Sequence, residues 1–306
     1  MIRSSIKLFV ALVMLVSLGQ AQIKVTHSEK LALPQTHSWS HPQFSPTGAA
    51  VYFTDLDGNG IWEYSLKSRA TRQITTDAKS GFSYSISADG KSLVYRRTQQ
   101  NSATTARKQD IVLTNLSKRS TSILASGSDV SIPTFSNNTP VYSIRSQVVG
   151  LAKIVGKNEV TVLGIENMKI VLNVNGNKTL LDPLGNGSYI WPVLSPDKQQ
   201  LVAYEMGKGA FVCDLTGKVQ SMLGRRDAPS WTRTGKWIVY MADKDDGHKL
   251  ISSDLCAVSP DGKTVVQLTP TSSVMELDPH CSPTENKIIC STSDGGIMVF
   301  EYEERP

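Results

Sequence analysis

The sequence predicts an all-β fold, a six-bladed β-propeller of four-stranded antiparallel blades whose ring is closed by a strand from the N-terminal segment. Three observations support this fold. A strand–turn–strand frame recurs along the chain, and further strands follow each copy to give a period of roughly 40–45 residues. No stretch shows helical periodicity long enough to compete with the alternation expected of strands. A ring of seven blades is the alternative.

The repeated frame is clearest at residues 41–53, where a strand ends in Phe44, the turn Ser45-Pro46-Thr47-Gly48 follows, and an apolar strand comes next. Pro suits the early turn position because its φ is preset, and Gly suits the late one because it accepts positive φ. Further copies cover residues 84–95, 133–142, 192–203, 229–240 and 279–290. The position of Phe44 is apolar in every copy, which predicts a core column: Ile86, Phe135, Leu194, Trp231 and Cys281.

Two segments fit the repeat poorly. Residues 144–168 carry short apolar runs without the frame, and we interpret them as a hairpin inserted into the third unit; a seventh, degenerate blade is the alternative. The last unit lacks a fourth strand, and residues 30–33 resemble the closing strands elsewhere. We therefore expect this N-terminal segment to close the ring.

The turn Pro260-Asp261-Gly262-Lys263 and the strand end Gln267-Leu268-Thr269 complete the pattern. Together with the Pro-x-aromatic-Ser-Pro-x-Gly frame, they resemble the TolB-like repeat, a WD-like propeller blade of bacterial envelope proteins. The resemblance covers nearly the whole mature chain. It implies a propeller that binds other envelope components. TolB also has an α/β domain in front of its propeller, for which this chain has no room, so the Tol–Pal role does not carry over.

Residues 1–21 have the pattern of a secretory signal peptide: a basic start with Arg3 and Lys7, an apolar stretch over residues 8–18, and small residues before a cleavage site at Ala21. This predicts a single propeller domain over residues 22–306, secreted or periplasmic, with no transmembrane segment in the mature chain. Without Arg3 and Lys7, the 32 Lys and Arg residues fall to 30 against 27 acidic residues, a net charge of +3. That balance argues against a nucleic-acid partner.

The loops that lead into the innermost strands share one face of a propeller with the loops that join the second and third strands. In this chain that face collects aromatic and Arg side chains, which binding hot spots favour. For Trp39 and Trp191, packing between blades is the alternative. The predicted binding face consists of Trp39, His41, Arg96, Arg97, Tyr189, Trp191, Arg225, Arg226, Asp227, Asp245, Asp246 and His248.

Motifs that could carry chemistry are few. Asp55, Asp57 and Asn59 match the opening of a calcium loop, but the bidentate Glu that should close it is replaced by Leu66, and the repeat predicts a tight turn there in any case. We therefore expect no cofactor, with calcium at these three residues as the alternative. The loop of residues 243–248 is the most distinctive polar cluster, and a solvated acidic turn is its alternative reading.

The histidines raise one enzymatic alternative. The TolB-like repeat also resembles that of oligogalacturonate lyases, in which a metal held by His assists proton abstraction. His41, His248 and His280 could meet at the mouth of the ring, but His41 and His280 lie on opposite sides of the repeat Pro, and strand alternation then predicts that they point to opposite faces. We expect no metal site. A nucleophile elbow, a phosphate loop and a Cys-x-x-Cys pair are all absent from the sequence.

The four cysteines lie at strand positions that are apolar in other units. Cys281 and Cys290 occupy adjacent strands of one hairpin and are the one plausible disulfide pair, although free core thiols are favoured. Taken together, the sequence predicts a monomeric, non-enzymatic binding module whose partner is an envelope protein or peptide held at the propeller mouth.

Overall fold

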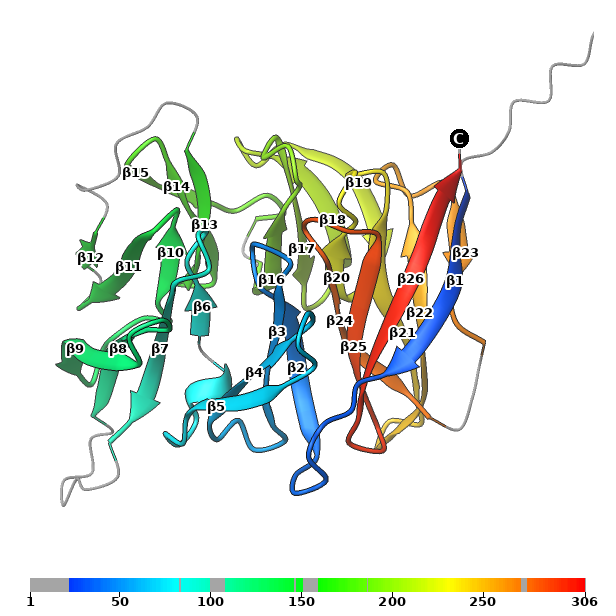
Figure 1. Cartoon of the computed structure of the whole chain (residues 1–306). Helices are drawn as coiled ribbons and strands as arrows, with labels where there is room; N and C mark the ends of the chain where they lie inside the picture. The colour runs from blue at the N-terminus through cyan, green and yellow to red at the C-terminus, as the bar shows by residue number, and fades with distance from the viewer. Residues whose placement is uncertain are drawn as a thin grey trace, which may run out of the picture.

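The computed structural model describes residues 22–82, 84–99, 108–145, 147–150, 159–185, 187–270 and 274–305. Over these residues it is a closed ring of seven antiparallel sheets, each a propeller blade (Figure 1). The predicted leader, residues 1–21, lies outside the described residues. Within them, no helix is long and apolar enough to span a membrane.

Five blades have four strands, and each blade is numbered here by its place in the chain. Blade 1 consists of β2 (Trp39–Phe44), β3 (Ala50–Asp55), β4 (Ile61–Ser65) and β5 (Thr71–Thr75). Blade 2 consists of β6 (Tyr84–Ile86), β7 (Ser92–Thr98), β8 (Gln109–Asn115) and β9 (Ser120–Gly127). Blade 5 consists of β16 (Tyr189–Leu194), β17 (Gln200–Glu205), β18 (Gly209–Asp214) and β19 (Val219–Gly224). Blade 6 consists of β20 (Asp227–Trp231), β21 (Ile238–Asp245), β22 (Leu250–Val258) and β23 (Val265–Gln267).

Blade 7 joins the two ends of the chain. Its strands are β24 (Glu276–Cys281), β25 (Lys287–Thr292) and β26 (Ile297–Arg305), and β1 (Gln22–Lys30) pairs with β26 from Gln22 opposite Arg305 to Lys30 opposite Met298. Figure 1 shows this pairing as the blue strand beside the red one. The N-terminal segment therefore closes the ring, as predicted. The closing strand is residues 22–30, however, not residues 30–33, of which Leu31 and Leu33 are buried in the core beyond the strand.

Blades 3 and 4 have three strands each among the described residues. They are β10 (Thr134–Ser136), β11 (Thr139–Ile144) and β12 (Gln147–Val149), then β13 (Val160–Glu166), β14 (Lys169–Val174) and β15 (Asn177–Leu181). The predicted count of six is therefore wrong, and the alternative of seven is confirmed. The segment read as an inserted hairpin contains the last strand of blade 3 and the first strand of blade 4.

Blade 4 escaped the repeat count because its first strand runs the other way. In the other blades the innermost strand ends at the first turn of the repeat, which is Ser-Pro in blades 1, 5 and 7, but β13 begins at that end of the ring. Its start is fixed there by Glu159, whose carboxylate accepts hydrogen bonds from Ser136 and Asn137, at the end of β10. A strand that enters from the turn side has no Pro-x-aromatic-Ser-Pro-x-Gly frame, so a search for that frame does not find it.

The core lies between neighbouring blades, where apolar side chains of adjacent sheets interlock. Phe44, Ile86, Phe135, Trp231 and Cys281 are buried, which confirms the predicted column. Leu194 is the exception, because it lines the central channel and is only partly buried. All four cysteines are buried free thiols, and Cys281 is not joined to Cys290.

The Ser of the repeated turn is buried because it holds the hairpin together. The Ser195 hydroxyl donates to Asp197 at 2.6 Å and accepts from the amide of Gln200 at 2.9 Å, and Ser45 and Ser87 make similar contacts. Gly48 takes φ +70° at the last turn position, and a Cβ there would lie 1.9 Å from the Thr284 hydroxyl of the neighbouring blade. These hydrogen bonds and the turn glycine therefore fix the backbone at the end of the ring where the repeated turns lie.

Candidate functional site: the central channel

The centre of the ring holds two adjoining cavities. One, of about 330 Å³, lies where the innermost strands begin and is called the mouth here; the other, of about 440 Å³, lies at the Ser-Pro turns and is called the turn end. The two cavities share four lining residues, which form the waist of the channel: Gln43, Val193, Ser230 and His280. Both volumes fall in the range of ligand pockets, roughly 300–1,000 Å³.

A repeated backbone feature shapes the mouth. In four blades the residue before the repeat Pro has a positive φ: His41 at 50°, Trp191 at 51°, Ala228 at 47° and Asp278 at 53°. At each of these places the register of the innermost strand shifts against the second strand. We call this residue the x-Pro position. Non-glycine residues rarely adopt positive φ, and the residue before Pro normally prefers extended conformations, so the feature carries strain of about 1–3 kcal/mol at each site.

The bulge turns the side chain at the x-Pro position into the channel, since all four of these residues line the mouth cavity. The prediction that His41 and His280 point to opposite faces is wrong. The two residues are two places apart in the repeat frame, one before and one after the Pro, and strand alternation puts residues two places apart on the same face. His41 and His280 consequently line the same cavity.

Two exposed aromatic side chains flank the mouth. Trp191 is 39% exposed and packs edge-on against Tyr204 with ring centroids 5.7 Å apart. Phe82, in a short 3-10 turn (Ser80–Phe82), is 45% exposed and packs edge-on against the His41 ring at 5.1 Å. Both rings therefore have a supported edge and free apolar surface beside the cavity.

The mouth is acidic on the side of blades 6 and 7. The carboxylate of Asp278 lines the cavity and lies 3.9 Å from Nε2 of His41. The pKa of Asp243 is raised, first because the carboxyl is partly buried and then because Asp227 and Asp278 are close. Arg225 pairs with Asp227 at 3.4 Å and Asp245 at 2.7 Å. One guanidinium thus lies among several carboxylates, and the surplus charge is negative.

The waist contains a histidine that is held neutral. Nδ1 of His280 accepts a hydrogen bond from the amide of Phe44, 3.3 Å away on the neighbouring blade, and burial lowers the pKa of His280 to about 4. An imidazole that accepts at Nδ1 carries its proton on Nε2. His280 therefore supplies a donor to the channel without adding positive charge at neutral pH.

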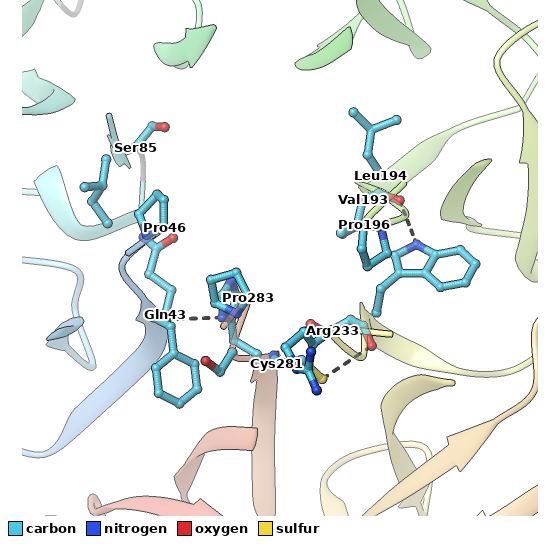
Figure 2. Close-up of a pocket in the computed structure, with 15 residues that line it drawn as sticks. Gln43, Pro46, Ser85, Val193, Leu194, Pro196, Arg233, Cys281 and Pro283 are labelled. Atoms are coloured by element: carbon cyan, nitrogen blue, oxygen red, sulfur yellow. Dashed lines mark hydrogen bonds between the residues drawn. The ribbon is translucent and has the colours of Figure 1, made fainter. Parts of the chain in front are cut away.

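The turn end has a different composition. Figure 2 shows Gln43, Pro46 and Ser85 on one side of an open space and Val193, Leu194 and Pro196 on the other, with Pro283 between them. The charged side chain of this end is Arg233, whose guanidinium donates to the Asn286 side chain at 3.1 Å. The rest of its wall combines prolines and core-column residues with polar residues such as Gln43, Ser85 and Ser282.

Two residues that were predicted on the binding face, Trp39 and Tyr189, are buried instead. Trp39 is 2% exposed, packs against Phe53 and Trp62 with ring centroids 5.0 Å away, and donates from its indole to the Pro34 carbonyl. Tyr189 is also 2% exposed, and its hydroxyl donates to Asp182 at 2.9 Å. Trp39 and Tyr189 both lie in the core between blades. For Trp39 this is the packing alternative given above, whereas Trp191, which had the same alternative, is at the mouth.

Arg96 and Arg97 are engaged within the fold. The Arg96 guanidinium donates to the carbonyl of Val130 at 3.0 Å, which joins blade 2 to the entry of blade 3. Arg97 bridges Asp77 and Asp110, with both closest distances at 3.1 Å. These contacts are structural, and neither residue lines the mouth cavity or the turn end.

The other predicted residues form a rim beside the mouth on blade 6. Arg226 stacks on the ring of Tyr240 at 4.7 Å, and Asp227 is buried beside Arg225. Asp246 accepts from the backbone amides of His248 and Lys249, so it holds the β21–β22 turn in shape. Asp245, Asp246 and His248 are exposed. The structure thus brings His41 and Trp191 together at the mouth and leaves the blade 6 residues at its edge.

The calcium-like loop is held by its own hydrogen bonds. Asp55 accepts from the amide of Asn59 at 2.7 Å, and Lys79 donates from Nζ to the Asp57 carbonyl and from its amide to the Asn59 side chain. The Lys79 ammonium group therefore contacts one backbone carbonyl of this loop, that of Asp57. Among the residues that the structure describes, no group of three or more His, Cys, Asp and Glu side chains is arranged to hold a metal ion.

Comparison with known proteins identifies solved structures that have a similar fold. A search with protein-family models and a search of the curated proteins both find no match. The structure resembles TolB from Acinetobacter baumannii with a TM-score of 0.55 and 18% identity, over 81% of this chain and 58% of that one, so this chain spans little more than half of that protein's length. It resembles the WD40 repeats of RRP9 with a TM-score of 0.61, 10% identity and coverage of 93% and 100%.

A third neighbour is an oligogalacturonate lyase in complex with manganese, with a TM-score of 0.51 and 11% identity, over 86% of this chain and 76% of that one. At such identities these similarities establish the fold. The chain is a seven-bladed β-propeller whose fold resembles those of TolB and of the WD40 repeats.

Sequence reasoning missed several residues that line the mouth, among them Gln43, Tyr84 and Asp278. A signal for Asp278 was available, because it occupies the same place before Pro as His41 and Trp191. That alignment does not by itself show that a bulge turns the position into the channel. Gln43 and Tyr84 lie in ordinary strand positions, and the sequence gives no signal for them.

Proposed function

We propose that this protein is a secreted or periplasmic binding module without catalytic activity, and that its mouth holds an envelope protein or a peptide. The observation that carries the proposal is the mouth cavity, where the exposed rings of Phe82 and Trp191 flank residues presented by a repeated strained bulge. Strain of this kind persists where surrounding structure enforces it, and it gathers at functional sites. The fold shared with TolB and the predicted leader support the envelope setting.

The test is capture of partners from an envelope extract of the producing cells. The mature chain should retain one dominant protein, and the double variant Phe82→Ala with Trp191→Ala should lose it. Met206→Ala with Met222→Ala is the matched control, because both methionines are exposed apolar residues outside the channel cavities. Equal capture by both double variants would contradict the choice of the mouth, and an empty capture would contradict the binding role.

The predicted location has its own test. Cell fractionation should recover a chain that begins at Gln22 outside the cytoplasm, because cleavage is expected after Ala21. Mass spectrometry of the purified N-terminus measures this. A full-length chain recovered from the cytoplasm would contradict the proposed setting while leaving the binding role open to its own test.

The rival function is a metal-assisted uronate lyase. One observation favours it, namely that His41 and His280 line the same cavity, as a shared metal site would require. Against it, Nδ1 of His280 accepts from the Phe44 amide, which leaves the proton on Nε2, so neither ring nitrogen offers a free lone pair to a metal. Incubation with oligogalacturonate and Mn²⁺ separates the two functions, because a lyase forms unsaturated products that absorb in the ultraviolet. Turnover abolished by His41→Ala would replace the binding proposal with the enzymatic one.

A further inference from the structure

The mouth cavity contains a carboxylate with no hydrogen-bonded partner. Within the described residues, the side chain of Asp278 accepts no hydrogen bond, and the nearest opposite group is Nε2 of His41 at 3.9 Å. The Asp278 side chain is 32% exposed, so it is partly withdrawn from water. A carboxylate in this position is best satisfied by a ligand that brings both charge and donors.

The surroundings of Asp278 reinforce its charge. Burial raises the pKa of Asp243, and the nearby charges of Asp227 and Asp278 raise it further, while Arg225 is already shared between Asp227 and Asp245. His280 is neutral at the waist. The charge that faces the mouth is therefore complementary to a cation and unfavourable for an acidic ligand.

The aromatic walls suit the same ligand. Trp191 and Phe82 flank the cavity, and cations bind over aromatic faces, to Trp most strongly. The Phe82 ring already has a cation nearby, because Nζ of Lys79 lies 5.9 Å from its centroid. An apolar ligand could fill the cavity between the rings, but it would leave Asp278 without a partner.

We propose that the mouth is a pocket for the basic side chain of an extended partner peptide, in which Asp278 pairs with the cation and Trp191 and Phe82 form its walls. This inference rests on the proposed binding function and specifies the chemistry of the partner. A guanidinium fits best, because it is planar, stacks on aromatic rings and donates in a fork to one carboxylate. Gln43 and Ser230, at the floor of the cavity, offer further acceptors.

The probe is a pair of acetylated, amidated pentapeptides with a central arginine or its neutral isostere citrulline in an alanine background. Binding to the full mature chain is measured by calorimetry or by NMR titration at low salt. The arginine peptide should bind, and citrulline should lower the affinity about tenfold, since the pair is partly desolvated and flanked by aromatic rings. Equal binding of the two peptides, or no binding of either, would overturn the inference.

The decisive variant is Asp278→Asn. Asn tolerates the positive φ of 53° at this position, so the fold and the bulge should be kept. It should reduce arginine-peptide affinity to the level of the citrulline peptide. Asp261→Asn removes the same charge from an exposed turn of blade 6, outside the channel cavities, and should change nothing. An unchanged affinity in Asp278→Asn would contradict the pairing.

The outcomes separate this inference from the proposed function. If a natural partner is captured through Phe82 and Trp191 but neither peptide binds, the binding role stands and the basic side chain is wrong. If neither partner capture nor peptide binding occurs, both proposals fail. A capture that survives Asp278→Asn with a partner lacking any Arg or Lys at the contact would also overturn the inference.

Discussion

The two ends of the channel share the four residues of the waist but are built differently. At the turn end, Ser45, Ser87 and Ser195 use their hydroxyl groups to close hairpins, and Pro and Gly positions are set by turn geometry. At the mouth, the x-Pro position has a fixed backbone but a free side chain, and it holds His, Trp, Ala or Asp in different blades. The side chains at the turn end are therefore needed to form the hairpins, whereas the side chain at the x-Pro position differs between blades.

This difference teaches where recognition can be placed in a repeat protein. Side chains that hold a turn cannot be changed without loosening the hairpin. At the x-Pro bulge the side chain does not close a hairpin, so residues that tolerate its positive φ can differ there from blade to blade. The mouth can therefore acquire an acidic and aromatic lining at no cost to the repeat, while the turn end keeps a similar chemistry in each blade.

The largest expected effect separates two tryptophans that were both predicted at the binding face. Trp39→Ala should destabilise the fold by about 3–5 kcal/mol, because a fully buried ring is removed from the contact between blades. Trp191→Ala should change stability by about 1 kcal/mol or less, because that ring is partly exposed at the mouth. Denaturant unfolding measures both, and equal losses would show that the mouth ring is a packing residue.

The next effect concerns binding and compares the two ends directly. Phe82→Ala with Trp191→Ala should weaken partner binding by about 2 kcal/mol or more, as loss of central aromatic contacts does in other interfaces. Arg233→Gln with Pro196→Ala alters the turn end by a similar number of groups and should leave the affinity within twofold. Calorimetry on the captured partner gives both values. A larger loss from the turn-end pair would reverse the assignment.

His280, at the waist of the channel, should make the stability of the fold depend on pH. The pKa of His280 is lowered to about 4 in the folded chain from an ordinary value of 6.5, so its contribution to stability is complete above pH 6.5 and is lost as pH falls towards 4. At pH 5 the loss should reach roughly 2 kcal/mol at most. Unfolding of the native chain and of His280→Gln at pH 7 and pH 5 measures it. A native chain and variant with parallel pH profiles would refute a neutral His280.

The smallest effect lies at the turn end. Lys198 occupies the last turn position of blade 5 with φ 57°, where blades 1, 2 and 6 have Gly. Lys198→Gly should relieve that strain and stabilise the chain by about 0.5 kcal/mol, since greater freedom of Gly in the unfolded chain offsets part of the gain. Its effect on partner binding should be nil. Thermal unfolding resolves the shift, and a clear destabilisation would show that the Lys198 contact with Glu159, at 4.0 Å, outweighs the strain.

Much of this fold could be predicted from sequence because its information is local. Turn residues, the Phe44 column and the period define six blades, and the unmatched end of the last unit predicts closure by the N-terminal segment. Blade 4 could not be predicted in this way, because a reversed first strand removes the frame on which the count depends. Its place in the ring is settled by contacts between blades, such as those of Glu159 with Ser136 and Asn137.

The site was less predictable for a related reason. The x-Pro bulge interrupts the pairing of the innermost strand in four blades, and His41 and His280, predicted on opposite faces, line the same cavity. Trp39 and Trp191 occupy neighbouring places in the same repeat frame, yet one is buried and the other is at the mouth. A shift of two residues around a bulge separates a core position from a binding position, and composition carries no signal for that shift.

The most direct test of the central claim is site-specific photocrosslinking in the cells that make the protein. A photoreactive amino acid is placed at Phe82 or Trp191 in the mouth, and at Pro46 or Pro196 in the turn end, and adducts are identified by mass spectrometry. The account predicts that the two mouth positions capture the same partner protein and that the turn-end positions do not. Capture of that partner from the turn end alone, or equally from both ends, would contradict it.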